Sequence, residues 1–232
     1  MEYIKTNRAF WNRYSKERGP WSRRSPKELI DKARQGGVEI FITTQKLVPV
    51  VWLPESWSGL KVLGLAAGGG QQMPIIAAAG ADVTSFDLSE EQLQRDLEVC
   101  REEGLKIEIL QGDMRDLSLL SDSYFDLIIN PVSNCFIDDV NSVWKECFRV
   151  LRPGGLLMSG SNNPVTYALD LKAYDEGKLS LCHKIPYSDL RDLSESERAV
   201  KIEQNDAFEF GHSLSELIGG QIAAGLVIKG FY

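Results

Sequence analysis

The 232-residue sequence lacks a long apolar run, a signal-peptide pattern and a cluster of metal-binding side chains. No apolar stretch reaches the ~18 residues that a membrane helix needs. The charged and aromatic N-terminus does not resemble a signal peptide. We therefore expect no membrane contact and a cytoplasmic location. The sequence has two histidines and four cysteines, none in a C-x-x-C pair, so we expect free thiols and no metal site.

An excess of positive charge is also missing. The sequence has 26 Lys and Arg against 33 Asp and Glu, which gives a net charge of −7. Because phosphate binding needs a basic surface, we expect no nucleic acid partner. A local basic run at residues 18–24 is interpreted as a solvated loop. The hydrophobic share of 43% is ordinary for one globular domain with a buried core.

The middle of the sequence alternates between strand and helix patterns. We predict strands at residues 61–65, 82–87, 106–111 and 124–130, and a fifth from residue 156. Between them, residues 71–80, 89–103 and 140–151 have the spacing and capping residues of helices. Strands that are separated by single helices form a parallel sheet with right-handed crossovers. The predicted fold class is therefore α/β, Rossmann-like, with helices on both faces of the sheet.

Two flanking regions complete a single predicted domain. Residues 1–60 are expected to form a helical cap, with one helix near residues 6–16 and a second that starts at Ser25-Pro26. Residues 61–160 form the core. The polar, aperiodic stretch at 161–212 is too long for a passive loop, so we interpret it as a lid over a substrate. Residues 213–232 are predicted to form a last helix and a sixth strand.

The turn at residues 64–70, with the sequence GLAAGGG, is the first feature that indicates a ligand. Glycines allow positive φ and close approach of the backbone, and the following helix directs free N–H groups toward a bound molecule. Asp87 ends the next predicted strand, 17 residues after Gly70, where an acid is placed to accept both hydroxyls of a ribose. The pair indicates an adenosine-type ligand and leaves open a nicotinamide cofactor or S-adenosylmethionine (SAM).

Five motifs together carry a family resemblance: VLGLAAGGGQQ, VTSFDLS, QGDMRDL, FDLIIN and FRVLRPGGLL, all within residues 60–160. In order and spacing the sequence resembles the class I SAM-dependent methyltransferases, most closely their UbiE-like, type 11 branch. The resemblance implies SAM as cofactor and the transfer of its methyl group to a small-molecule substrate.

The resemblance assigns residues to each part of SAM. Gly64, Ala66, Gly68 and Gly70 match the glycine-rich loop around the methionine part of SAM. Asp87 matches the acid that binds the ribose, and Leu88 the residue that packs on the adenine face. Asp113 and Met114 match the pair at the adenine edge, and Asn130 matches the strand end that faces the methyl group. Two positions depart from the family pattern, which usually has an acid where this chain has Gly64 and a glycine where it has Ala66. The missing acid removes a common anchor of the loop.

Catalytic residues are less clear from the sequence. Methyl transfer is a direct displacement with a neutral thioether as leaving group, so a base is needed only where the acceptor must lose a proton. The candidates are His183 in the expected lid, Tyr14 in the N-terminal helix, and Asn130. In related enzymes a similar helix covers the SAM site, so Tyr14 or Trp11 is expected to do so here.

Two alternatives to this interpretation are kept. The spacing of Gly64, Gly68 and Gly70, with Tyr174 four residues before Lys178, also matches a short-chain dehydrogenase, but that family begins with its glycine-rich strand. A non-catalytic SAM-binding module is the second alternative. The related methyltransferases usually end with an antiparallel seventh strand, which we expect to be missing here. The exposed sheet edge that results is a candidate surface for homodimerisation.

Overall fold

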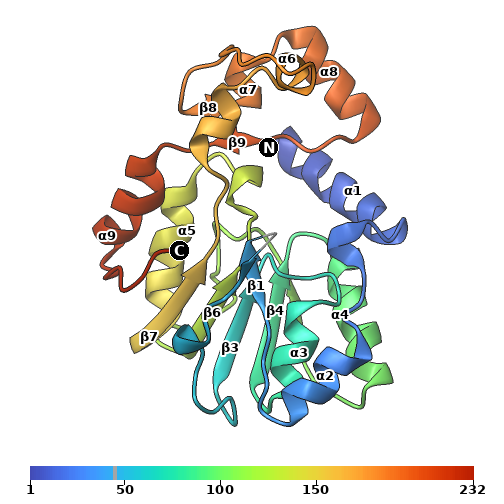
Figure 1. Ribbon diagram of the computed structural model, residues 1–232, viewed down its shortest axis with the longest axis vertical. Helices are drawn as coiled ribbons and strands as arrows, with labels where there is room; N and C mark the ends of the chain where they lie inside the picture. The colour runs from blue at the N-terminus through green and yellow to red at the C-terminus, as the bar shows by residue number, and fades with distance from the viewer. Residues whose placement is uncertain (44–45) are drawn as a thin grey trace.

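The structure is a computed structural model that describes residues 1–43 and 46–232. Its centre is a five-stranded parallel sheet in the order β5-β4-β3-β6-β7 (Figure 1). The strands are β3 (Lys61–Leu65), β4 (Asp82–Asp87), β5 (Glu108–Gln111), β6 (Phe125–Asn130) and β7 (Leu151–Ser159). The predicted parallel, Rossmann-like sheet is confirmed. β7 starts earlier than expected, because the Pro-Gly-Gly segment lies inside the strand at a register shift.

Helices cover both faces of this sheet (Figure 1), with α2, α3 and α4 on one face and α5 and α9 on the other. The α-helices are α1 (Glu2–Lys16), α2 (Lys27–Arg34), α3 (Gln72–Ala78), α4 (Glu90–Glu102), α5 (Val140–Val150), α6 (Leu171–Asp175), α7 (Asp189–Asp192), α8 (Glu195–Gln204) and α9 (Gly220–Ala224). A π-helical turn, η5 (Ser215–Gly219), precedes α9, and short 3₁₀ turns are η1 (Pro20–Ser22), η2 (Val50–Trp52), η3 (Asn134–Phe136) and η4 (Pro164–Ala168).

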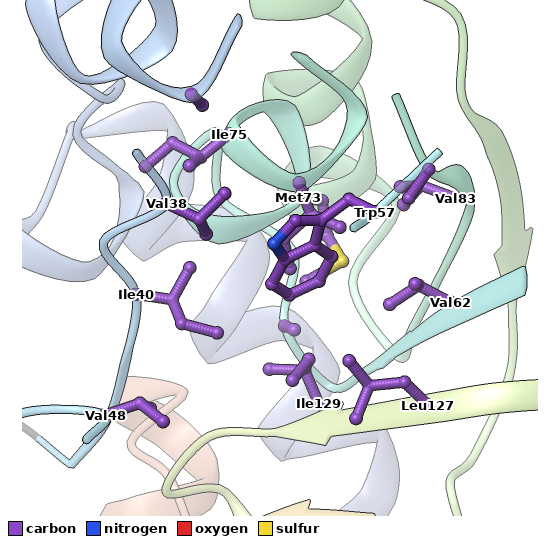
Figure 2. Close-up of a cluster of buried hydrophobic side chains, with 14 of the residues drawn as sticks. Val38, Ile40, Val48, Trp57, Val62, Met73, Ile75, Val83, Leu127 and Ile129 are labelled. Carbon is purple, nitrogen blue, oxygen red and sulfur yellow. The ribbon is translucent and has the colours of Figure 1, made fainter. Parts of the chain in front are cut away.

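The two faces of the sheet carry separate apolar cores. Val62 of β3 packs into the core shared with α2 and α3, which Figure 2 shows together with Trp57 and Met73. The next residue, Leu63, belongs to the other core, which includes Trp144 of α5. Successive strand residues point to opposite faces, so a strand covered on both sides is apolar throughout. This explains why the central strands were recognisable as continuous apolar runs.

Helix starts agree only in part with expectation. Ser89 Oγ accepts the Gln92 N–H at 3.1 Å, as predicted for the start of α4. Ser25 does not cap α2, whose preceding residue is Pro26. The Ser25 hydroxyl instead donates to the carbonyl of Gln71 at 2.7 Å, so the N-terminal segment is bonded to the glycine-rich turn.

Residues 161–212 are a structured layer. They contain α6, α7 and α8, and two short strands, β8 (Tyr187–Ser188) and β9 (Phe210–Gly211), that pair with each other. The layer lies beyond the carboxyl ends of the parallel strands, next to α1 (Figure 1). Because β8 and β9 form a sheet of their own, this region adds no seventh strand to the central sheet. Two further short strands, β1 (Phe41–Thr43) and β2 (Lys46–Leu47), pair antiparallel with each other.

The predicted sixth strand at residues 226–232 is wrong. Gly225 ends α9 at φ +106°, and the following residues form no strand. The ring of Tyr232 instead packs edge-on against Trp52 at 4.9 Å between centroids, so the segment is held by side-chain packing and not by a strand ladder. Among the described residues, none pairs with the outer edge of β7.

Candidate active site

A cavity of about 570 Å³ lies at the carboxyl ends of the parallel strands. The turn after β3 and the ends of β4 and β6 form one part of its wall, and α1, the segment around η1 and the β1 strand form another. Asn162 and Glu209, from the two ends of the 161–212 layer, complete it. Its volume is within the ~300–1,000 Å³ of small-molecule sites, which occur at this edge of α/β sheets.

The turn after β3 forms a narrow cradle. Ala66, Gly69 and Gly70 have φ values of +49°, +124° and +77°. A Cβ atom at Gly69 would lie 2.4 Å from the carbonyl oxygen of Trp21, so backbone from η1 touches the turn directly. Glycine is required there for both conformation and space.

Backbone N–H groups of this turn donate to residues of β4 and α4. The Gly68 N–H donates to Asp87 Oδ2 at 3.2 Å, and the Gly69 N–H donates to the carbonyl of Gln92 at 3.0 Å. The Gly70 N–H donates to Asp96 Oδ1 at 2.7 Å. The turn is therefore fixed by two carboxylates, of which the sequence indicated only Asp87.

Asp87 borders the cavity at the end of β4. Besides the Gly68 bond, its Oδ1 accepts the Ser89 N–H at 2.9 Å. Burial raises the pKa of Asp87 to about 6, against the lowering effect of these backbone bonds. A carboxylate has about four acceptor positions, so each oxygen keeps one for a ligand. Two hydroxyls on adjacent carbons, as in a ribose, fit that pair.

Three more predicted residues line the cavity next to Asp87: Leu88, Asp113 and Met114. Asp113 is held by Arg115, whose Nε donates to Oδ1 at 3.0 Å and whose Nη2 donates to Oδ2 at 2.6 Å. Oδ1 also accepts the Arg115 N–H at 3.0 Å, so the remaining acceptor position of Asp113 is on Oδ2. Met114 is buried beside Ser133.

Gly64, Gly70 and Asn130 do not line the cavity. Gly64 lies under α3, where a Cβ atom would be 2.1 Å from the sulfur of Met73. Asn130 is fully buried, and its amide donates to the carbonyl of Leu65 and to Ser133 Oγ, both at 2.9 Å. The structure therefore places Asn130 as a link between β3 and the turn after β6, and not facing the cavity as expected.

The sequence-based catalytic candidates are also outside the cavity. Tyr14 stacks on Phe10 at 5.7 Å between ring centroids, and His183 is exposed beside Tyr187. Trp11 of the same N-terminal helix does line the cavity and packs edge-on against Phe136 at 5.1 Å. The expectation that α1 covers the site holds for Trp11 and not for Tyr14.

Glu209 is an ionisable residue of the cavity wall that the sequence did not indicate. Its Oε2 accepts the Tyr167 hydroxyl at 2.7 Å, and that hydroxyl accepts a bond from Asn162 at 3.1 Å. Oε1 has no hydrogen-bond partner among the described residues. The available signal was an acid between two apolar aromatics, Phe208 and Phe210, just before the last helix. Such a pattern also occurs in ordinary short strands.

The surroundings of Glu209 affect its ionisation. Burial raises the pKa of Glu209, and the hydrogen bond from Tyr167 lowers it. Asp189 and Asp206 raise it further, and Lys201 lowers it. The neighbouring Cys135 is buried in the wall, and burial raises the pKa of its thiol to about 12. Glu209 is therefore a carboxyl whose pKa lies above the usual range, next to a thiol that stays neutral.

A family profile described as a methyltransferase domain matches residues 63–159. Over 226 residues the chain is 44% identical to YbaJ, an uncharacterized methyltransferase of Bacillus subtilis (strain 168), with 97% of this chain and 88% of the relative covered. The chain belongs to the methyltransferase family. The sequence-based assignment to the SAM-dependent methyltransferases is confirmed, and the dehydrogenase alternative is excluded.

The chain is also similar to two other methyltransferases, one in sequence and one in fold. A ubiquinone biosynthesis O-methyltransferase of Methylococcus capsulatus is 33% identical over 119 residues, which cover 51% of this chain and 48% of that enzyme. A SAM-dependent methyltransferase of Mesorhizobium loti has the same fold, with a TM-score of 0.59, 20% identity, and 78% and 79% of the two chains covered.

Tyr174 and Lys178, the pair that matched a dehydrogenase, lie outside the cavity. In the part of the chain that the structure describes, no helix is long and apolar enough to cross a membrane. Within the same residues, no group of three or more His, Cys, Asp and Glu side chains is arranged to hold a metal ion.

Proposed function

We propose that this methyltransferase binds SAM along the turn after β3 and the end of β4, and methylates a small molecule held between α1, η3 and the 161–212 layer. The observation that carries the proposal is a single cavity that joins Asp87 and the glycine-rich turn to Trp11, Cys135 and Glu209. A volume of about 570 Å³ leaves room for a compact acceptor beside the cofactor.

The residues at one end of the cavity fit SAM. Asp87 has one open acceptor position on each oxygen for the ribose hydroxyls, and Leu88 and Met114 provide apolar surface for the adenine ring. A Cβ atom at Gly68 would lie 3.2 Å from Asp87 Oδ2, so the cradle needs the absence of a side chain there. Asp113 retains one acceptor position for the adenine amino group. We assign Gly64 and Gly70 a supporting role behind the cradle.

Bound SAM supplies an activated methyl group on a sulfonium. The protein's contribution is to hold the acceptor in line with that group, an effect that can supply ~7–11 kcal/mol. Trp11 and Phe136 form an apolar wall that restricts the acceptor and excludes water. Cys135 adds apolar surface to the same wall, since its thiol stays protonated.

Glu209 is assigned as the proton acceptor of the site. A general base works best when its pKa lies near the operating pH, and burial moves the pKa of Glu209 in that direction. Its free Oε1 is available to accept a hydrogen bond from the hydroxyl, thiol or ammonium group of the substrate that is to be methylated, while the Tyr167 hydroxyl donates to Oε2. This favours acceptors that lose a proton on methylation.

The 161–212 layer is assigned as a substrate lid within a single domain. It contributes Asn162 and Glu209 to the cavity and packs beside α1, which carries Trp11. The free cysteines are consistent with a cytoplasmic enzyme. The unpaired edge of β7 supports a homodimer formed through that edge, and the net charge of −7 argues against a nucleic acid partner.

The test is transfer of a labelled methyl group from SAM to a panel of phenols, alcohols, carboxylic acids, thiols and amines. We expect labelled product with one equivalent of S-adenosylhomocysteine for at least one class. Calorimetry with S-adenosylhomocysteine and with NADPH accompanies the panel, and only the first should bind. Binding of S-adenosylhomocysteine without transfer to any class would favour the non-catalytic module instead.

A further inference from the structure

Asp96 of α4 is a fully buried carboxylate outside the cavity wall. Its Oδ1 accepts the Gly70 N–H, and its Oδ2 accepts the Ser85 hydroxyl, both at 2.7 Å. Among the described residues, no Lys, Arg or His forms an ion pair with it. An unpaired buried charge is costly to a protein, so its position against the glycine-rich turn needs a reason.

The position where the family usually has its loop acid cannot carry one here. A Cβ atom at Gly64 would lie 2.1 Å from the sulfur of Met73 and 2.8 Å from its Cγ. Met73 is itself fully buried in the core under α3 (Figure 2), so it has little room to move. The side chain of Met73 fills the space that an acid at position 64 would need, so an anchor for the turn must come from another residue.

Asp96 approaches the turn from the helix side. Gly70, the residue that it holds, has φ +77°, and its carbonyl accepts the Ser25 N–H at 2.8 Å. The bond from Asp96 therefore fixes the end of the turn at the point where the N-terminal segment also attaches. Ser85 of β4 is the register partner of Gly64 in β3, and its hydroxyl donates to Asp96 Oδ2. The carboxylate of Asp96 therefore reaches from α4 to the neighbour of the position where the acid is missing.

We propose that Asp96 is a positioning residue that replaces the acid missing at position 64, and that its negative charge keeps the glycine-rich turn in the shape that receives SAM. The proposal rests on the placement of SAM given above. Its consequence is that removing the charge weakens cofactor binding although the residue does not line the cavity.

The same charge should destabilise the protein without ligand. Burial raises the pKa of Asp96 to about 7, with a smaller contribution from the charge of Asp87; the Ser85 and Gly70 bonds lower it. Cys100, one turn along α4, also faces Asp96, and its thiol stays neutral because burial raises its pKa to about 12. Folding thus favours the protonated form, so the contribution to stability falls as pH rises from the ordinary value of 3.8 to about 7.

The experiment compares wild type, Asp96→Asn, Asp96→Ala and a matched control, Asp126→Asn. Asp126 is also a poorly exposed carboxylate, 9% exposed, that accepts a backbone N–H of β3, from Lys61 at 2.7 Å. Unlike Asp96 it has an ion-pair partner, the exposed Arg152, so it controls for the loss of a carboxylate charge away from the cavity. It lies at the opposite end of the sheet from the cavity. Affinity for S-adenosylhomocysteine is measured by calorimetry and stability by thermal unfolding, each from pH 5.5 to 8.5.

At pH 8 we expect Asp96→Asn to bind S-adenosylhomocysteine about fivefold more weakly, because a neutral acceptor replaces a charged one. Its midpoint of unfolding should rise by about 2–4 °C or more at pH 8, and should not rise at pH 5.5, where Asp96 is protonated. Asp96→Ala should bind at least about tenfold more weakly. Asp126→Asn should keep the wild-type affinity and the wild-type dependence of affinity on pH, because Asp96 is intact in it.

Three other outcomes would contradict the proposal or the cofactor site on which it rests. Unchanged affinity in Asp96→Asn, with normal binding by wild type, would overturn the positioning role. A parallel loss of stability and affinity at every pH would also overturn it, because it would assign Asp96 to the fold alone. No binding of S-adenosylhomocysteine by wild type would instead contradict the proposed cofactor site.

Discussion

The two ends of the cavity are built differently. At the turn end, residues 64–96 are close in sequence and are joined by backbone N–H groups that donate to Asp87 and Asp96. At the end proposed to hold the methyl acceptor, the Tyr167 hydroxyl donates to Glu209, which is 42 residues away in the sequence. The amide of Asn7 of α1 donates to the carbonyl of Phe208, which is 201 residues away. A short motif can describe the first end, whereas the second exists only after the chain has folded.

Loss of the acceptor-end carboxylate should have the largest effect. Glu209→Gln keeps the size of the side chain but cannot take a proton, and removal of a general base typically costs ~10²–10⁴-fold in rate. We expect turnover to fall by at least ~100-fold with the acceptor that the panel identifies, and the S-adenosylhomocysteine affinity to stay within about twofold. Single-turnover kinetics and calorimetry measure the two quantities. A matched loss of cofactor affinity would mean that the two ends are not separate.

The turn end should respond in the opposite way. Asp87→Ala removes the bonding of the ribose hydroxyls to a charged carboxylate, an interaction worth ~1.5–3 kcal/mol in total, so S-adenosylhomocysteine should bind about 10- to 100-fold more weakly. Asp87→Asn should lose less, because an amide oxygen still accepts one bond. Turnover at saturating SAM should change much less than affinity. Unchanged binding by Asp87→Ala would refute the placement of the ribose.

A smaller change tests the support of Glu209. Tyr167→Phe removes the hydrogen bond that lowers the pKa of Glu209, so that pKa should rise further. The base is active when ionised, so the acidic limb of the pH–rate profile should move to higher pH, with a loss of about 3- to 10-fold at neutral pH. Activity should recover at alkaline pH. A pH-independent loss would assign Tyr167 to packing, because its ring also stacks on Tyr187.

Much of the turn end followed from the sequence. Strands β3 to β6, the glycine-rich turn and the acid that ends β4 were predicted within two residues, because apolar periodicity and glycine spacing report local conformation. Asp96 was not recognised, although it is only nine residues after Asp87, because an acid on a helix is normally solvent-exposed. Its burial depends on how α4 packs on the sheet.

The acceptor end shows the limit of the same reasoning. His183 was favoured as a base for its chemistry, but it is exposed outside the cavity, whereas Glu209 reaches the wall from just before β9. Asn130 was expected to face the methyl group, but four neighbouring polar groups occupy its amide. The expected strand at residues 226–232 had an apolar pattern but found no partner strand.

Local sequence patterns were enough to predict the parallel sheet, the order of its elements, and a cavity edge lined by Asp87, Leu88, Asp113 and Met114, since these depend on residues within a few tens of positions of one another. Packing between distant segments places Glu209 in the cavity wall, buries Asp96 against the glycine-rich turn and leaves residues 226–232 outside the sheet. Burial produced by this packing raises the pKa of Asp96 and of Glu209, an effect that patterns in neighbouring residues do not report.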